Sequence, residues 1–264
     1  MRDKRMSSKD VGALVLFLVV AFLAAGVLGA VQPVTRIPGE VIELTQFGPA
    51  LGVGLAALLW PDRVRALLTG AAEPPGRAGG GRPALLVATA PLIIVASAAA
   101  YAALAGDTRV AGTAAPFALI AWAQLVGACA EEVGWRCFLQ PLLRTRFGPL
   151  GASVAVGAAW GLWHVPVLAE HPVYAAAFLL AAVSMSVVLG WALEGMGERR
   201  LPLAGGFHAL INLGMLLFMD EESGAVLPMA LFGASCLAAA VVWTWASRPG
   251  GAPARIPAVL KDVR

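Results

Sequence analysis

The chain has 264 residues, of which 59% are hydrophobic and only 13% are charged, and its mean hydropathy is +0.79. Because a soluble domain carries about 25% charged residues, this composition excludes a soluble globular protein. The formal net charge of +3 does not indicate nucleic-acid binding, because the basic residues lie between apolar segments, where they set membrane orientation and contact anionic lipid.

Eight apolar segments follow one another along the chain, and a membrane span needs roughly 20 such residues. They cover residues 11–31, 44–61, 84–105, 114–134, 150–169, 173–193, 203–219 and 225–246. The first is longer than the core of a signal peptide and lacks a small-residue cleavage site, so we expect a retained helix. The sequence therefore predicts an all-α, polytopic transmembrane bundle of about eight helices in the cell membrane.

Lysine and arginine are distributed unevenly between these segments. If the N-terminus is cytoplasmic, 17 of the 19 basic residues lie in cytoplasmic loops and tails, and only Arg36 and Arg109 lie outside. Positive residues are concentrated on the cytoplasmic side of membrane proteins. We therefore predict that both termini are cytoplasmic; the sequence leaves the oligomeric state open.

The chain forms a single predicted membrane domain, 1–264. Its expected parts are a cytoplasmic N-terminus (1–10), a first helical pair (11–61), a flexible cytoplasmic loop (62–83), a helical core (84–246) that contains the catalytic region 114–220, and a cytoplasmic tail (247–264). The loop is predicted from its proline and glycine content. The three cysteines have no metal-binding spacing, and we expect no structural disulfide.

Two adjacent carboxylates, Glu131 and Glu132, lie near the end of the apolar stretch 117–133, whose only other polar side chain is Gln124. Ionisable groups at membrane depth normally face a bundle interior and mark a functional site. Glu132 and Arg136 are one helical turn apart and can pair, whereas Glu131 is rotated by about 100° and points elsewhere. This spacing favours Glu131 as a general base. The alternative is an ion pair at a helix end, with both acids reaching the membrane surface.

Two further polar pairs lie in later segments, Trp160 with His164 and His208 with Asn212. Each pair has i, i+4 spacing, which places both side chains on one helix face. A single histidine in an apolar helix is more often a packing residue, but His208 and Asn212 share a face and each needs a polar partner. In the segment of Trp160, the four-residue glycine spacing 157/161 predicts close helix packing.

These residues suit hydrolysis by an activated water, and two schemes remain open. In the first, Glu131, His164 and His208 hold a zinc ion. In the second, Glu131 deprotonates a water while His208 and Asn212 stabilise the oxyanion. The sequence contains neither a His-Glu-x-x-His zinc-protease motif nor a Gly-x-Ser-x-Gly elbow, so those hydrolase classes are disfavoured.

The ordered motifs Glu-Glu-x-x-x-Arg, aromatic-x-x-x-His and His-x-x-x-Asn resemble the CPBP family. This family comprises CAAX prenyl endopeptidases and bacteriocin-processing intramembrane proteases, also called the Abi family. The resemblance covers about residues 114–220. It implies that Glu131 activates water, that His164, His208 and Asn212 complete the catalytic or metal-holding set, and that Glu132, Arg136 and Trp160 support it. The aromatic position is commonly phenylalanine in the family, whereas this chain has the bulkier Trp160.

The resemblance implies an intramembrane endopeptidase that acts on a membrane-associated protein or peptide, with a prenylated CAAX protein as one substrate class. The alternative is a non-catalytic member of the fold that serves as an immunity, scaffold or chaperone-like protein. A proton-coupled transporter would show paired broken helices, which the sequence lacks. Glu131 and His208 are expected within roughly 10 Å of the cytoplasmic helix ends and His164 about 20 Å deep, so we predict a cavity open to the cytosol.

Overall fold

The computed structural model describes residues 6–72, 82–105, 111–113, 115–219 and 224–247, and this part of the chain is helical without a β-strand. The α-helices are α1 (Ser8–Thr35), α2 (Gly48–Leu59), α3 (Pro61–Leu68), α4 (Pro83–Ala105), α5 (Phe117–Glu132), α6 (Gln140–Arg144), α7 (Pro149–Trp163), α8 (Pro172–Ala192), α9 (Arg200–Phe218) and α10 (Val226–Ala246). Short 3-10 turns are η1 (Leu44–Phe47), η3 (Val165–Ala169) and η4 (Gly197–Arg199), and η2 (Val133–Leu139) is a π-helix.

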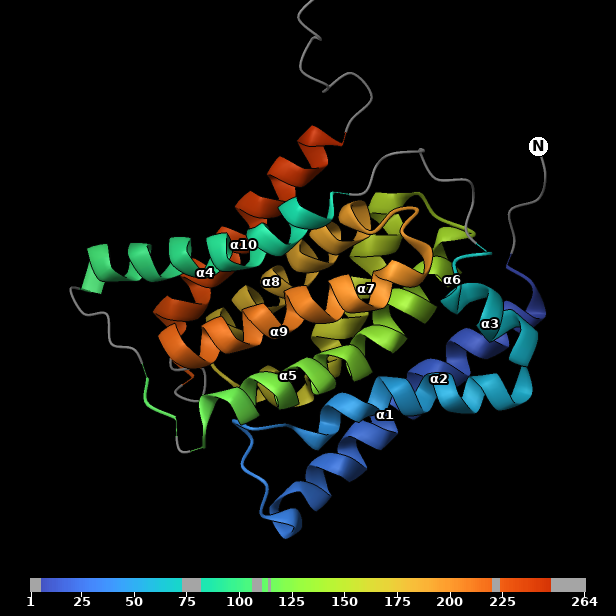
Figure 1. Cartoon of the computed structure of the whole chain (residues 1–264), viewed down its shortest axis with the longest axis horizontal. Coiled ribbons are helices and arrows are strands. Elements are labelled where there is room, and N and C mark those ends of the chain that lie inside the picture. The colour runs from blue at the N-terminus through green and yellow to red at the C-terminus, as the bar shows by residue number, and fades with distance from the viewer. Residues whose placement is uncertain (1–5, 73–81, 106–110, 114, 220–223, 248–264) are drawn as a thin grey trace, which may run out of the picture.

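The helices form a bundle in which the functional segments are central. Helices α1 and α2 pack together at one edge, and α4 and α10 pack together at the other (Figure 1). Between them, α5 packs on α9, and α8 packs on both α7 and α10. All three predicted motifs therefore lie in the interior of the bundle, on α5, α7 and α9.

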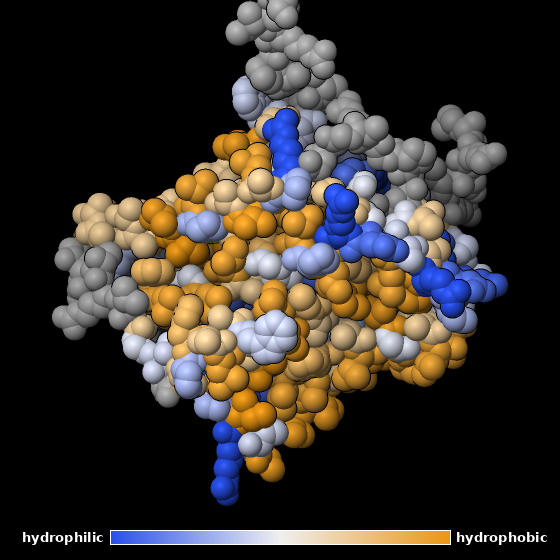
Figure 2. Space-filling view, viewed as in Figure 1, coloured by the Kyte–Doolittle hydropathy of each residue, from blue (hydrophilic) through white to orange (hydrophobic). Residues whose placement is uncertain are grey.

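Each of the eight expected apolar segments contains a helix, which confirms the polytopic helical bundle. Six helical segments of the described chain are long and apolar enough to span a membrane: 8–35, 83–105, 117–144, 172–192, 197–218 and 226–246. The other two are shorter, because residues 44–59 begin with the 3-10 turn η1 and α7 stops at Trp163. Apolar side chains cover most of the visible surface, with polar residues gathered toward its ends (Figure 2).

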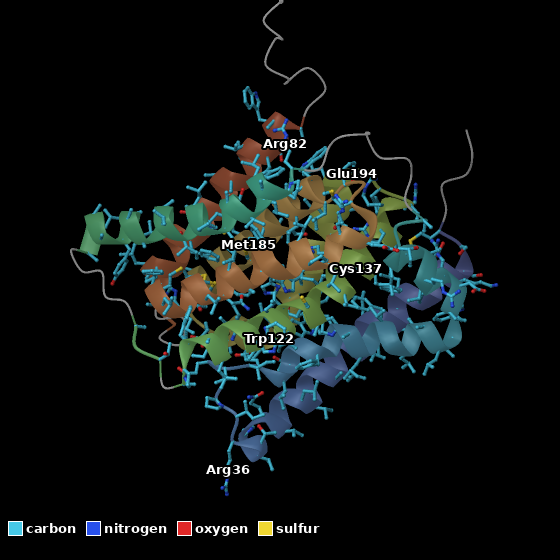
Figure 3. The ribbon with its side chains drawn as sticks, in the orientation of Figure 1. Arg36, Arg82, Trp122, Cys137, Met185 and Glu194 are labelled. Atoms are coloured by element: carbon cyan, nitrogen blue, oxygen red, sulfur yellow. The ribbon has the colours of Figure 1, made fainter. Side chains whose placement is uncertain are left out.

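The loops separate into two ends, as the distribution of basic residues predicts. At one end, Asp10 pairs with Arg63 at 2.6 Å (Nε–Oδ1), and Arg144 pairs with Glu194. At the other end, the Ala115 amide donates to Glu40 at 3.1 Å. Figure 3 shows Arg36 at the end opposite to Arg82 and Glu194. The cytoplasmic placement of the Arg82 end stays a prediction.

The expected flexible loop 62–83 is partly helical. Its first residues belong to α3, whose side chains Val64 and Leu67 are buried against the bundle. This amphipathic turn was missed because the proline- and glycine-rich residues after it dominated the composition. Residues 73–81 of the loop, the tail from residue 248 and the first five residues lie outside the described chain.

The helix that carries the carboxylates continues far beyond the expected boundary near residue 134. Helix α5, η2 and α6 form one apolar helical segment from Phe117 to Arg144. Glu131 is therefore near its middle, up to roughly 20 Å along the axis from Arg144. The expected position of Glu131 near a helix end is wrong, because Arg136 and Gln140 are buried inside the bundle and do not mark the membrane surface. Glu131 and His164 consequently lie at comparable depth.

The predicted close approach at the two glycines of α7 is present. A Cβ atom on Gly157 would lie 2.6 Å from the Val183 Cα, and one on Gly161 would lie 2.8 Å from a Leu179 methyl carbon. Both neighbours belong to α8. The missing side chains therefore let α7 and α8 pack backbone against backbone.

Gly157→Ala is expected to destabilise the protein by about 1–3 kcal/mol, because even a methyl group would collide with the α8 backbone. The measurement is the free energy of unfolding in mixed detergent micelles. Gly54→Ala in α2 is the matched control, since a Cβ there meets nothing within 4 Å. Equal stability of the two variants would contradict the tight α7–α8 contact.

Candidate active site

Glu131 is buried at the centre of the bundle, with 2% of its surface exposed. The indole Nε1–H of Trp160 donates to its Oε2 at 2.9 Å. The side-chain amide of Gln46, from η1, lies near the same carboxylate. Three separate elements, α5, α7 and η1, therefore fix one carboxylate in an apolar interior.

Glu132 faces a different set of partners, as its 100° rotation from Glu131 predicts. Its Oε2 lies 3.2 Å from the Arg136 Nε, and both side chains are fully buried. Its Oε1 accepts a hydrogen bond from the His208 Nδ1 at 2.9 Å. Glu132 thus links α5, the π-helical stretch and α9. Wide helical turns of this kind often occur at functional sites, and Arg136 lies within η2.

The side chain of Trp160 contacts every charged member of the candidate site except Glu132. Its ring centroid is 5.1 Å from that of His208 and 5.9 Å from that of His164, both in edge-on geometry. The Arg136 guanidinium carbon lies 5.1 Å from the same centroid. Trp160 therefore brings the three sequence motifs together, which a smaller aromatic residue without an N–H group would do less completely.

His164 ends α7 and has a defined tautomer. Its Nδ1 lies 2.9 Å from the Trp160 carbonyl oxygen. A carbonyl only accepts hydrogen bonds, so Nδ1 carries the proton and the Nε2 of the neutral ring carries a lone pair. The helix stops here because Pro166 lacks an N–H group, and the chain continues in the 3-10 turn η3.

Asn212 is tied to residues that sequence reasoning left out of the site. Its Nδ2 donates to the Gln124 Oε1 at 3.0 Å, and the Gln124 amide donates to the carbonyl oxygen of Glu40 at 3.2 Å. Gln124 precedes Glu131 by two helical turns on the same face, so its position as a lone amide in an apolar helix was a usable signal. Gln46 offered no such signal, because only the tertiary fold brings η1 to α5.

The donor types present are those that zinc prefers, namely one carboxylate and two imidazoles whose Nδ1 atoms are fixed by acceptors. In the described residues, however, no three His, Cys, Asp or Glu side chains come together as a group that could hold a metal ion. The side chains as they are arranged do not fit a metal.

A cavity lies beside this cluster, on the side of the Arg82 end. It contains about 240 Å³ of empty space, counting the part that opens outward. Its lining residues come from η2, α6, the end of α8 and the start of α9: Arg136, Gln140, Arg144, Leu189, Gly190, Leu193, Glu194 and Arg200. This cavity adjoins the cluster through Arg136 and is not lined by Glu131, so the expected cytosolic cavity at the catalytic residues stays a prediction.

Comparison with known proteins finds a family model that matches the same region. Residues 113–214 match the model of the Rce1-like type II CAAX prenyl endopeptidases. The chain is 28% identical over 130 residues to CAAX prenyl protease 2 of Methanococcus maripaludis, covering 45% of this chain and 46% of that protein. It is 25% identical over 130 residues to lysostaphin resistance protein A of Staphylococcus aureus, covering 49% of this chain and 31% of that protein. The chain therefore spans less than half the length of these relatives.

Proposed function

Because residues 113–214 match the Rce1-like family model, we propose that this multi-pass membrane protein is an intramembrane endopeptidase in which Glu131 activates the hydrolytic water. The observation that supports this most is the convergence of Glu131, His164 and His208 on one residue, Trp160. A carboxylate with two imidazoles inside an apolar bundle suits general acid–base chemistry.

Glu131 takes the role of the base. Its carboxylate removes a proton from water as the oxygen attacks the scissile carbonyl carbon. The Trp160 N–H holds the carboxylate in one orientation, so that little reorganisation accompanies the proton transfer. The Nε2 lone pair of His164 accepts a hydrogen bond from the second O–H group of the same water and thereby orients the water.

His208 and Asn212 face the charge that develops on the substrate. Because the His208 Nδ1–H is donated to Glu132, its Nε2 remains for the substrate. In the imidazolium form this nitrogen donates to the tetrahedral oxyanion and then gives its proton to the leaving amine. Asn212 uses one amide hydrogen on Gln124 and retains a second for the oxyanion.

Zinc remains a separate proposal, and no step above passes through it. If zinc takes part, the side chains of Glu131, His164 and His208, which form no metal site as they are arranged, would have to move together to hold it, and it would supply a more acidic bound water. Metal analysis of the purified protein decides between the schemes. The zinc scheme predicts about one equivalent of metal and loss of activity after chelation, whereas the carboxylate scheme predicts activity that survives removal of the metal.

The substrate class follows from the family description. We propose that the chain cuts a membrane-associated protein at a C-terminal Cys-a-a-X sequence whose cysteine is prenylated. The test uses the purified protein in liposomes with a farnesylated peptide that ends in such a sequence, and with the same peptide lacking the farnesyl group. Release of the C-terminal tripeptide from the farnesylated peptide, detected by mass spectrometry, is expected. Failure to cut it would refute this substrate class.

Trp160→Phe is expected to lower kcat/KM by roughly 10–100-fold, because it removes one charge-assisted hydrogen bond to Glu131 while keeping the aromatic ring. Trp243→Phe is the matched control. It removes the bond from Nε1 to the Thr89 hydroxyl at 3.1 Å, between α10 and α4, and should leave kcat/KM unchanged. If Trp160→Phe retains full activity, the indole N–H does not orient the base.

A further inference from the structure

The guanidinium group of Arg136 has N–H donors without hydrogen-bond acceptors in the described part of the chain. The side chain is 0% exposed, and its contact with Glu132 is an ion pair that lacks hydrogen-bond geometry. Its Nε, Nη1 and Nη2 atoms have no hydrogen-bond acceptor among the described residues. A buried donor without an acceptor is costly, so this arrangement indicates an acceptor that the chain itself does not provide.

Arg136 lines the cavity, and the other polar lining residues are suited to an anion. Arg144 and Arg200 add two guanidinium groups, and the side-chain amide of Gln140 donates to the Ser153 hydroxyl at 3.1 Å. Glu194 is the single acidic lining residue, and it is engaged by Arg144 through both carboxylate oxygens. Among the lining residues themselves, three guanidinium groups stand beside one carboxylate, and the counter-charge of Arg136, Glu132, lies outside the lining.

The size and position of the cavity limit what it can take. Its enclosed part has room for little more than one water-sized group, far less than a site that encloses a whole drug-sized ligand. It suits one terminal group of a longer molecule. Arg136 also contacts Trp160, which holds Glu131, so the cavity adjoins the proposed catalytic cluster through the Arg136 side chain.

We propose that this cavity is a carboxylate-binding subsite that receives the C-terminal carboxylate of the peptide being cut. The inference rests on the proposed function. A Cys-a-a-X sequence has three residues after the cysteine, which span about 10 Å when extended. Arg136 follows Glu131 by five residues, about 7.5 Å along the helix. A peptide bond next to Glu131 and a terminal carboxylate next to Arg136 are thus compatible with one extended tripeptide.

The test measures binding in the Glu131→Gln chain, so that it does not depend on turnover. The probes are the tripeptide Ala-Val-Met with a free carboxylate and the same tripeptide as a C-terminal amide. Calorimetry is expected to show roughly 10–100-fold tighter binding of the acid, the difference made by a charge-assisted contact. Equal affinity of acid and amide would overturn the proposal, and this comparison needs no cavity variant.

The Gln140→Glu variant tests whether the preference for the tripeptide acid comes from this cavity. This isosteric change places a carboxylate beside Arg136, where it occupies the position of the substrate carboxylate, and the preference for the acid should fall to less than threefold. Gln32→Glu, which adds the same charge on α1 at the Arg36 end, should keep the preference. An unchanged preference in Gln140→Glu would place the carboxylate elsewhere.

Two further measurements complete the test. The first distinguishes a phosphate group from a peptide carboxylate as the bound anion, and the second distinguishes failure of the subsite from failure of the proposed function. If inorganic phosphate or phosphatidylglycerol vesicles bind in a Gln140-dependent manner and the tripeptide acid does not, the cavity takes phosphate and the carboxylate subsite is wrong. If the wild-type chain cleaves the farnesylated peptide equally well with a free C-terminal carboxylate and with a C-terminal amide, the subsite is wrong and the proposed function is retained. A Gln140-dependent acid preference without cleavage overturns the proposed function alone.

Discussion

Glu131→Gln is expected to lower the rate of peptide hydrolysis by about 10²–10⁴-fold, the contribution of a positioned general base. The substitution keeps the shape of the side chain, and its carbonyl oxygen still accepts the hydrogen bond from the Trp160 indole. Only the ability to take a proton from water is lost. The measurement compares the peptide termini of membrane proteins from cells that carry the wild type with those from cells that carry the variant at equal protein levels.

New termini that are present with the wild type and absent with the variant would establish proteolysis and identify substrates. Glu43→Gln is the matched control, because this exposed carboxylate lies in the loop before η1 and should leave the termini unchanged. Identical termini in all three strains would instead favour a non-catalytic immunity, scaffold or chaperone-like protein. That outcome would remove the basis for assigning Glu131 as a base.

Glu132→Leu is expected to destabilise the fold by about 3–5 kcal/mol, because it leaves the fully buried Arg136 without its counter-charge. The variant also removes the acceptor that fixes the His208 ring. Most of the protein should therefore be lost from the membrane or unfold at much lower denaturant. The measurement is the free energy of unfolding in mixed micelles, with Glu131→Gln as a control that loses activity and retains stability.

The double variant Glu132→Leu/Arg136→Met distinguishes an unpaired charge from a packing defect. Replacing both partners of a buried ion pair with apolar residues of similar volume is often neutral, so the double variant should recover most of the stability that the single variant loses. It should remain inactive, because His208 still lacks its acceptor. A double variant as unstable as Glu132→Leu would show that the loss comes from packing and not from the uncompensated guanidinium.

The fold class could be predicted from the sequence, because each apolar segment has to satisfy its own backbone hydrogen bonds within the membrane. Helix ends were predicted less well. The segment of Glu131 was expected to end near residue 134, yet it continues to Arg144. Charged residues signal a membrane surface only when they are exposed, and here Arg136 is enclosed by neighbouring helices, which the local sequence does not reveal.

The chemistry of the motifs was readable from the sequence, whereas their partners were not. The i, i+4 spacing of Glu132 and Arg136 fixes their common face, and the structure contains that ion pair. By contrast, the contact of Trp160 with Glu131, the approach of Gln46 and the cavity beside Arg136 each join elements that are far apart in the chain. Helical periodicity determines which side chains share a face. Only the packing of whole helices determines which faces meet, because that depends on close contacts such as Gly157 against α8.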